Sequence, residues 1–195
     1  MFFAGFQAWQ DEHDQVKGQL TYFHADWSSN AHPNIPPIFK INAAPFWNVS
    51  FANVGSYLAD KAYTVVDLES YDIPTSEIGS SQPPTTPEIE SQLFDKMRKK
   101  LPSIDRRPVA SFAPGDTSWS TGWYSHPLIQ SEVDAFEGTA SPRTKMMFVV
   151  GFSVWSDGSG RHEWPFCWLL VPHGTNQPTI MDCKSHNTFM PEAEE

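Results

Sequence analysis

The sequence predicts an α+β domain in which an N-terminal helix packs on a curved antiparallel sheet. Three patterns predict it: a helical stripe near the N-terminus, a strand in the middle of the chain, and a β-hairpin in the last third. A helix packed on one face of an antiparallel sheet is an α+β arrangement. Because 195 residues can form one domain with a sizeable core, we expect a single domain spanning residues 1–195.

The N-terminal helix is predicted from spacings of three and four between the residues of one stripe, which is the period of a helix face. We expect the helix to run through residues 2–27 and to end at "NAHPNIPP". His13 lies on the stripe, where we expect a core or edge histidine. The stripe consists of Phe2, Phe6, Trp9, His13, Val16, Leu20, Phe23 and Trp27.

The middle of the chain alternates between strand and helix patterns. Residues 38–50 favour a weak strand interrupted by Pro45, residues 51–61 a short helix, and residues 62–74 a strand. A Ser-, Thr- and Pro-rich loop follows this strand.

A second long helix is predicted after this loop. Thr86 is its plausible N-cap, and Pro87 is its first helical residue. The apolar stripe of this helix is Ile89, Leu93, Met97 and Leu101.

The last third is predicted to be mostly strands, after an irregular aromatic stretch at residues 113–127. We expect strands at residues 128–138 and 178–189, and a hairpin with a Gly-containing turn at residues 148–172. Both faces of the second hairpin strand are apolar, so something must cover each side of the sheet. One face carries Trp164, Phe166, Trp168 and Leu170, and the other carries Pro165, Cys167, Leu169 and Val171.

The composition limits the classes of function. A net charge of −10 and a pI near 5.0 argue against nucleic-acid binding over the whole surface, although not against a local basic patch. Cys167 and Cys183 form neither a disulfide framework nor a zinc-binding spacing, which favours a reducing, intracellular setting. The N-terminus lacks the basic region of a signal peptide, and no segment has the length of a membrane span. The "NVS" at Asn48 matches a glycosylation acceptor but receives no role.

The order of elements resembles the nuclear transport factor 2-like cone. Residues 144–174, "TKMMFVVGFSVWSDGSGRHEWPFCWLLVPHG", are similar to a hairpin of the small subunit of the heterodimeric, fungal-type mRNA export receptor. Residues 54–74, "VGSYLADKAYTVVDLESYDIP", resemble its short helix and following strand. One departure is an insertion of about fifty residues, 75–126, within the domain.

The resemblance implies a non-enzymatic subunit without cofactor or metal. It implies a heterodimer with the large receptor subunit, binding of phenylalanine-glycine nucleoporins, and shuttling between nucleus, nuclear pore and cytoplasm. Two such cones pack sheet against sheet, and an acidic residue bridges the interface, with Asp72 the better match and Asp67 the second. The expected aromatic interface consists of Phe152, Trp155, Trp164, Phe166 and Trp168.

One basic run stands out in this acidic chain, within "FDKMRKKLPSIDRR". Its cations could contact RNA phosphates or a ribosomal subunit. They could instead stabilise the dipole of a helix C-terminus. The residues concerned are Lys96, Arg98, Lys99, Lys100, Arg106 and Arg107.

An enzymatic alternative is a small dehydratase or cyclase of the same fold, with a Tyr, Asp and His set inside the cone. An Asp-oriented His can shuttle a proton to an enolising substrate. No local motif is formed by the residues available by type, which are Tyr22, His24, Asp26, Asp67, His126 and His162.

Overall fold

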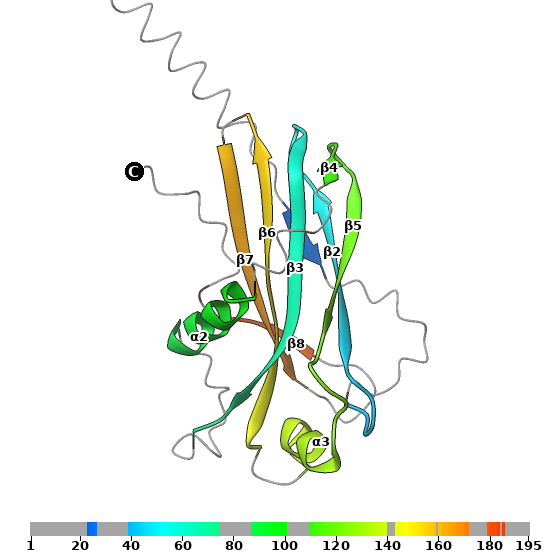
Figure 1. The fold of residues 1–195 in the computed structure, drawn as a ribbon, viewed down its shortest axis with the longest axis vertical. Helices are drawn as coiled ribbons and strands as arrows, with labels where there is room; N and C mark the ends of the chain where they lie inside the picture. Colours follow the sequence, from blue (N-terminus) through cyan, green and yellow to red (C-terminus); the bar gives the residue numbers. More distant parts are fainter. Residues whose placement is uncertain are drawn as a thin grey trace, which may run out of the picture.

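A computed structural model describes residues 23–26, 39–74, 87–100, 110–139, 143–158, 160–171, 179–183 and 185. These residues form two helices and eight strands, so the predicted α+β class is confirmed at that level (Figure 1). The strands are β1 (Phe23–Asp26), β2 (Phe46–Asn53), β3 (Ala59–Asp72), β4 (Ala110–Phe112), β5 (Thr117–Trp123), β6 (Lys145–Asp157), β7 (Gly160–Val171) and β8 (Thr179–Asp182). The helices are α2 (Pro87–Arg98) and α3 (Gln130–Glu137).

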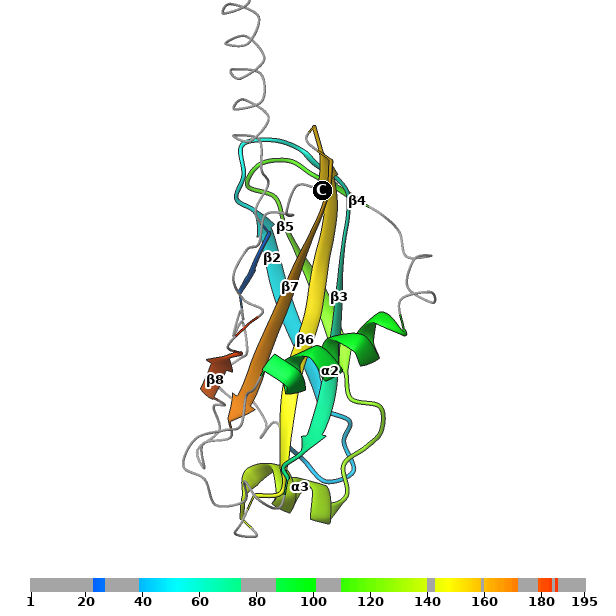
Figure 2. The same cartoon turned by 90° about the vertical axis from the view of Figure 1, so that its left-hand side faces the viewer.

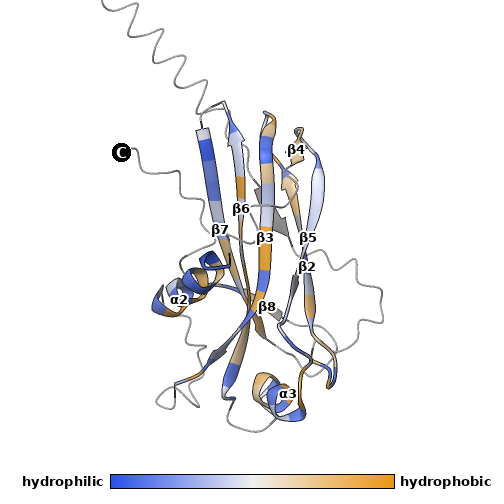
Figure 3. Cartoon of the chain, in the orientation of Figure 1, coloured by the Kyte–Doolittle hydropathy of each residue, from blue (hydrophilic) through white to orange (hydrophobic). Residues whose placement is uncertain are grey.

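The strands form two antiparallel sheets. The larger sheet has the order β4-β3-β6-β7-β8, and the smaller has the order β1-β2-β5. The predicted hairpin is confirmed as β6 and β7, whose register runs from Met147 opposite Leu170 to Asp157 opposite Gly160. Residues in the middle of β3 are hydrophobic, whereas the end of β7 next to the hairpin turn is hydrophilic (Figure 3). The larger sheet is therefore apolar at its centre and polar where the hairpin turns.

The main core lies between the two sheets. Inward side chains of β2, such as Trp47 and Val49, share this core with one face of the β6–β7 hairpin. Helix α3 closes one end of the core, where Phe136 stacks on Phe39 with ring centroids 5.1 Å apart. The hairpin residues in this core are Met147, Val149, Trp155, Trp164, Phe166, Trp168 and Leu170.

Helix α2 covers the opposite face of the larger sheet (Figure 2). Its predicted start at Pro87 is confirmed, and three residues of its predicted stripe are buried, namely Ile89, Leu93 and Met97. They pack with the second apolar face of the hairpin, which includes Cys167 and Leu169. The predicted N-cap Thr86 and the last stripe residue Leu101 lie outside the described residues. Both faces of the hairpin are apolar because the same chain covers both of them.

The predicted short helix at residues 51–61 is wrong. Strand β2 continues to Asn53, and β3 already begins at Ala59. The predicted irregular stretch at residues 113–127 is also wrong, because it contains the regular strand β5. Both errors concern strands whose partners lie far away in the sequence.

The strand predicted at residues 128–138 is wrong as well, because this segment contains helix α3. The Glu132 carboxylate accepts the Ile129 N–H at the start of the helix. Gly138 ends the helix with a φ of 69°, a conformation that glycine adopts without strain.

Three further expectations concern the N-terminal helix, the two cysteines and the predicted insertion. Phe23–Asp26 form strand β1 and not the last turns of the N-terminal helix, whose remaining residues, His13 among them, lie outside the described ranges. Cys167 and Cys183 form a disulfide that joins β7 to the residue after β8, although the sequence favoured free thiols. The range predicted as an insertion, 75–126, contributes α2, β4 and β5 to the fold.

Candidate docking site on the outer face of the smaller sheet

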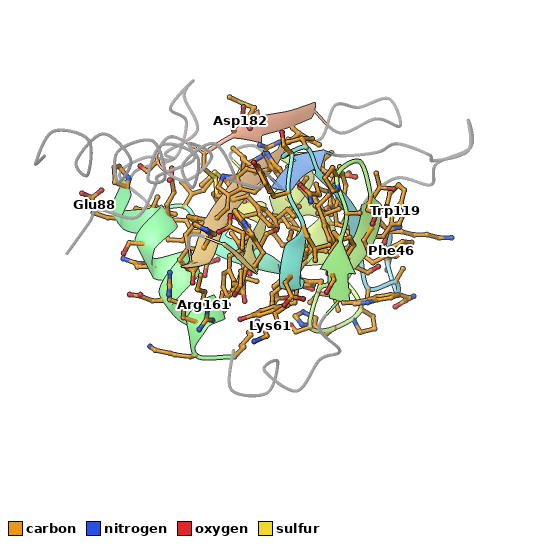
Figure 4. All side chains as sticks on the ribbon, turned by 90° about the horizontal axis from the view of Figure 1, so that it is seen from above. Phe46, Lys61, Glu88, Trp119, Arg161 and Asp182 are labelled. Atoms are coloured by element: carbon orange, nitrogen blue, oxygen red, sulfur yellow. A yellow bond between two sulfur atoms is a disulfide. The ribbon has the colours of Figure 1, made fainter. Side chains whose placement is uncertain are left out.

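Three large aromatic side chains lie exposed on the outer face of β2 and β5. Phe46, Trp119 and Trp123 are 53%, 49% and 59% exposed. Phe46 and Trp123 are cross-strand partners with ring centroids 5.1 Å apart, and Trp119 lies further along the same strand. Phe46 and Trp119 lie on the side of the molecule opposite to α2 (Figure 4). We call the surface formed by Phe46, Asn48, Trp119, Thr121 and Trp123 the outer aromatic face.

The alternation of a β-strand explains why these aromatics point outward. On β5 the alternate residues are small, and Ser120 and Gly122 face β3. A Cβ atom at Gly122 would lie only 2.9 Å from Val66 Cγ1, so this close approach of β5 to β3 requires glycine. The Ser120 hydroxyl donates to a backbone carbonyl of β3. The same packing that fixes β5 therefore holds Trp119 and Trp123 on the outside.

The centre of the outer aromatic face is polar but uncharged. Thr121 Oγ1 donates to Asn48 Oδ1 over 2.7 Å, across the strand pair. Neither β2 nor β5 contains an acidic or basic residue. A surface of exposed aromatics without charges has the composition found at the centre of protein–protein interfaces.

The aromatic residues expected at the partner interface lie inside the chain. Trp155 and Phe166 face the smaller sheet and Phe152 faces α2, and all three are fully buried. Trp164 and Trp168 are at most 9% exposed. A partner cannot reach these rings in this conformation, because the smaller sheet and α2 already cover them. Three exposed aromatics, Phe46, Trp119 and Trp123, lie instead on β2 and on β5, a strand that the sequence did not predict.

The two candidate interface carboxylates both have lysine partners in the same chain. Asp67 pairs with Lys100, which follows α2. Asp72 pairs with Lys145 over 2.6 Å, and its side chain is largely exposed at the end of β3. Asp72 therefore remains accessible to another molecule.

The predicted basic cluster is largely paired with carboxylates of the larger sheet. Lys96 and Lys100 both contact Glu69, a nearly buried residue of β3, and Arg98 pairs with Glu163 of β7. Burial lowers the pKa of Lys100, but its hydrogen bonds to carboxylates of β3 outweigh this effect and raise the pKa overall. These three cations therefore serve contacts within the chain.

The remaining three members of the basic run are Lys99, Arg106 and Arg107. Lys99 is exposed beside the end of α2. Arg106 and Arg107 lie outside the described residues.

The residues of the enzymatic alternative belong to separate contacts. His162 bonds the buried carboxylate of Asp157 over 2.9 Å at the turn end of the hairpin. His126 bonds Glu132 over 2.9 Å near the start of α3. Asp67 has its lysine partner at the end of α2. Outside the described part of the chain lie Tyr22 and the side chains of His24 and Asp26.

Comparisons with protein-family models, curated proteins and solved structures found no match to this chain. Among the described residues, no group of three or more His, Cys, Asp or Glu side chains could hold a metal ion. No helix in the described ranges is long and apolar enough to cross a membrane. The exposure of Phe46, Trp119 and Trp123 makes the outer aromatic face the site that the geometry favours. Its sequence signal is the alternation in "TSWSTGW" of β5.

Proposed function

We propose that the chain is a non-enzymatic binding protein that docks a protein partner on the outer aromatic face. The observation that carries the proposal is the exposure of Phe46, Trp119 and Trp123 on two paired strands that contain no charged residue. Exposed aromatic patches of this kind mark interaction sites, because aromatic side chains are enriched and charges depleted at the centre of interfaces. Burying these rings would stabilise a complex through the hydrophobic effect.

Nucleic acid is a poorer ligand for this face. Phosphates are bound by lysine and arginine, and β2 and β5 contain neither. Three cations of the basic run, Lys96, Arg98 and Lys100, already pair with carboxylates. An RNA contact would have to compete with these ion pairs.

The resemblance supplies a more specific proposal. In it, the chain forms a nuclear transport factor 2-like cone, and the partner is the large subunit of an mRNA export receptor. What supports this version is that such subunits pack sheet against sheet, and that the outer aromatic face offers one sheet face for such a contact. In this version the contact uses Trp119 and Trp123 in place of the buried hairpin aromatics.

The proposal is tested by capture of partner proteins on immobilised chain. The variant Trp119→Ser/Trp123→Ser removes two exposed rings, and Leu58→Ser removes a 52% exposed apolar side chain outside β2 and β5 as a matched control. We expect the wild type and the control to retain the same partner proteins and the double variant to lose them. Co-expression with the large export subunit tests the specific version. Equal capture by all three proteins would refute docking on this face.

A further inference from the structure

We propose that the protein docked on the outer aromatic face is a second copy of the chain, so that two smaller sheets pack face to face around a two-fold axis. This inference rests on the proposed function, because it names the partner at the same face. Most soluble oligomers are homo-oligomers, and two-fold dimers are the commonest among them.

Charge favours this face as the contact between copies. Each chain carries a net charge of −10, so two copies repel one another over most approaches. The outer aromatic face contains no charged residue, so β2 and β5 of two copies can meet without opposing like charges there, and the acidic residue of the same sheet, Asp26, lies on β1 in register with Ser50. The exposed carboxylate of Asp72 lies on β3, in the larger sheet.

The face is also self-complementary along β5. The outward positions of β5 are Thr117, Trp119, Thr121 and Trp123, and Thr121 lies midway between the two tryptophans. A two-fold axis that crosses the strands at Thr121 places Trp119 of one copy opposite the Phe46–Trp123 pair of the other. This arrangement is isologous, because each copy contributes the same surface.

One hydrogen bond at the centre of the face is made within a single copy. Thr121 and Asn48 already hydrogen-bond to each other over 2.7 Å, so the Thr121 hydroxyl has an acceptor when water leaves. The Thr121 hydroxyl therefore requires no acceptor from the other copy, whereas the N–H groups of the Asn48 amide would have to meet acceptors there. The pair can therefore lie under the partner sheet without losing this bond.

The exposed area fits the core of a dimer interface. A large aromatic side chain presents about 200 Å², so three half-exposed rings on each of two copies contribute about 600 Å². Specific interfaces bury at least about 1,000 Å² in total. The rings supply more than half of that minimum. The exposed neighbours Asn48 and Thr117 lie on the same two strands and can contribute to the rest.

The association state of the full chain tests the inference by sedimentation over a range of concentrations up to on the order of 100 µM. We expect the wild type to dimerise. Thr121→Arg and Thr121→Glu should each weaken the dimer at least about 100-fold, because the axis brings the two identical charges together. Leu58→Arg, outside β2 and β5, should leave the dimer unchanged.

A mixture of the two charge variants gives the decisive result. If position 121 faces itself across a two-fold axis, Thr121→Arg and Thr121→Glu copies should pair with each other and restore association to within about tenfold of the wild type. Circular dichroism checks that both variants are folded. Failure of the folded variants to associate in the mixture would overturn this geometry.

The outcomes separate this inference from the proposed function. A wild-type chain that stays monomeric at the highest concentration overturns the homodimer, and capture of a different protein that needs Trp119 and Trp123 would still support docking on this face. A monomer whose tryptophan variant also captures the same proteins as the wild type overturns both.

Discussion

Neutralising two lysines of the basic run should destabilise the fold, which distinguishes a structural role from contact with RNA. In Lys96→Met/Lys100→Met, the carboxylate of Glu69 stays nearly buried, with 4% side-chain exposure, and loses both lysine partners. Removing one partner of a fully buried ion pair costs about 3–5 kcal/mol. The two lysine side chains are 57% and 45% exposed, so water screens the pair and the expected loss is about 2 kcal/mol.

Thermal and urea unfolding measure this loss. For a chain of this size, about 2 kcal/mol lowers the Tm by about 4–8 °C. Lys99→Met, an exposed change beside them, should leave the Tm within about 2 °C of the wild type. Adding Glu69→Gln to the double variant removes the unpaired charge and should recover part of the stability. An unchanged Tm together with a loss of RNA affinity would refute the ion-pair reasoning and favour phosphate contacts.

Three further predictions follow from individual contacts. The raised pKa of Lys100 means that its stabilising contribution is complete below the unfolded pKa of about 10.4 and is lost as the pH rises through the higher folded value; Lys100→Met should reduce this alkaline loss in urea titrations. Asn53→Ala should lower the free energy of unfolding by about 3 kcal/mol, because the buried amide donates to two backbone carbonyls and accepts a backbone N–H; a change under about 1 kcal/mol in calorimetry would contradict this. Removing the disulfide with Cys167→Ser/Cys183→Ser should cost about 3 kcal/mol for a loop of this length, and wild-type unfolding curves unaffected by reductant would contradict it.

The parts of the fold that the sequence predicted are those with local signals. The β6–β7 hairpin follows from two long apolar runs and a Gly-containing turn, and α2 from a proline start and a stripe at helical spacing. Residues 128–138 misled the prediction because "LIQSEVDAFEG" contains both alternating and helical apolar spacings. The Gly138 C-cap and the Glu132 carboxylate, which accepts the Ile129 N–H, stabilise the two ends of the helix and favour it over a strand.

The docking site could not be predicted from the sequence, because its exposure depends on which surfaces the chain itself covers. No local sequence pattern contains this information. Trp164 and Trp168 of the hairpin and Trp119 and Trp123 of β5 are the same residue type at the same spacing along a strand. The first pair is buried because β2 supplies a second layer over the larger sheet. The second pair is exposed because Gly122 places the opposite face of β5 against β3. Exposure is therefore a property of the packing between distant strands.

The same reasoning applies to the basic run, whose clustering in sequence suggested a surface for phosphates. The cations lie at the end of α2, and α2 packs on the face of β3 that carries Glu69. A carboxylate on a largely apolar strand face requires a partner when a helix covers it. Lys96 and Lys100 supply that partner, so the acidic residue on β3 and the basic residues at the end of α2 satisfy each other. A cluster of like charges in the sequence therefore predicts an external ligand only where the fold brings no opposite charges of the same chain next to it.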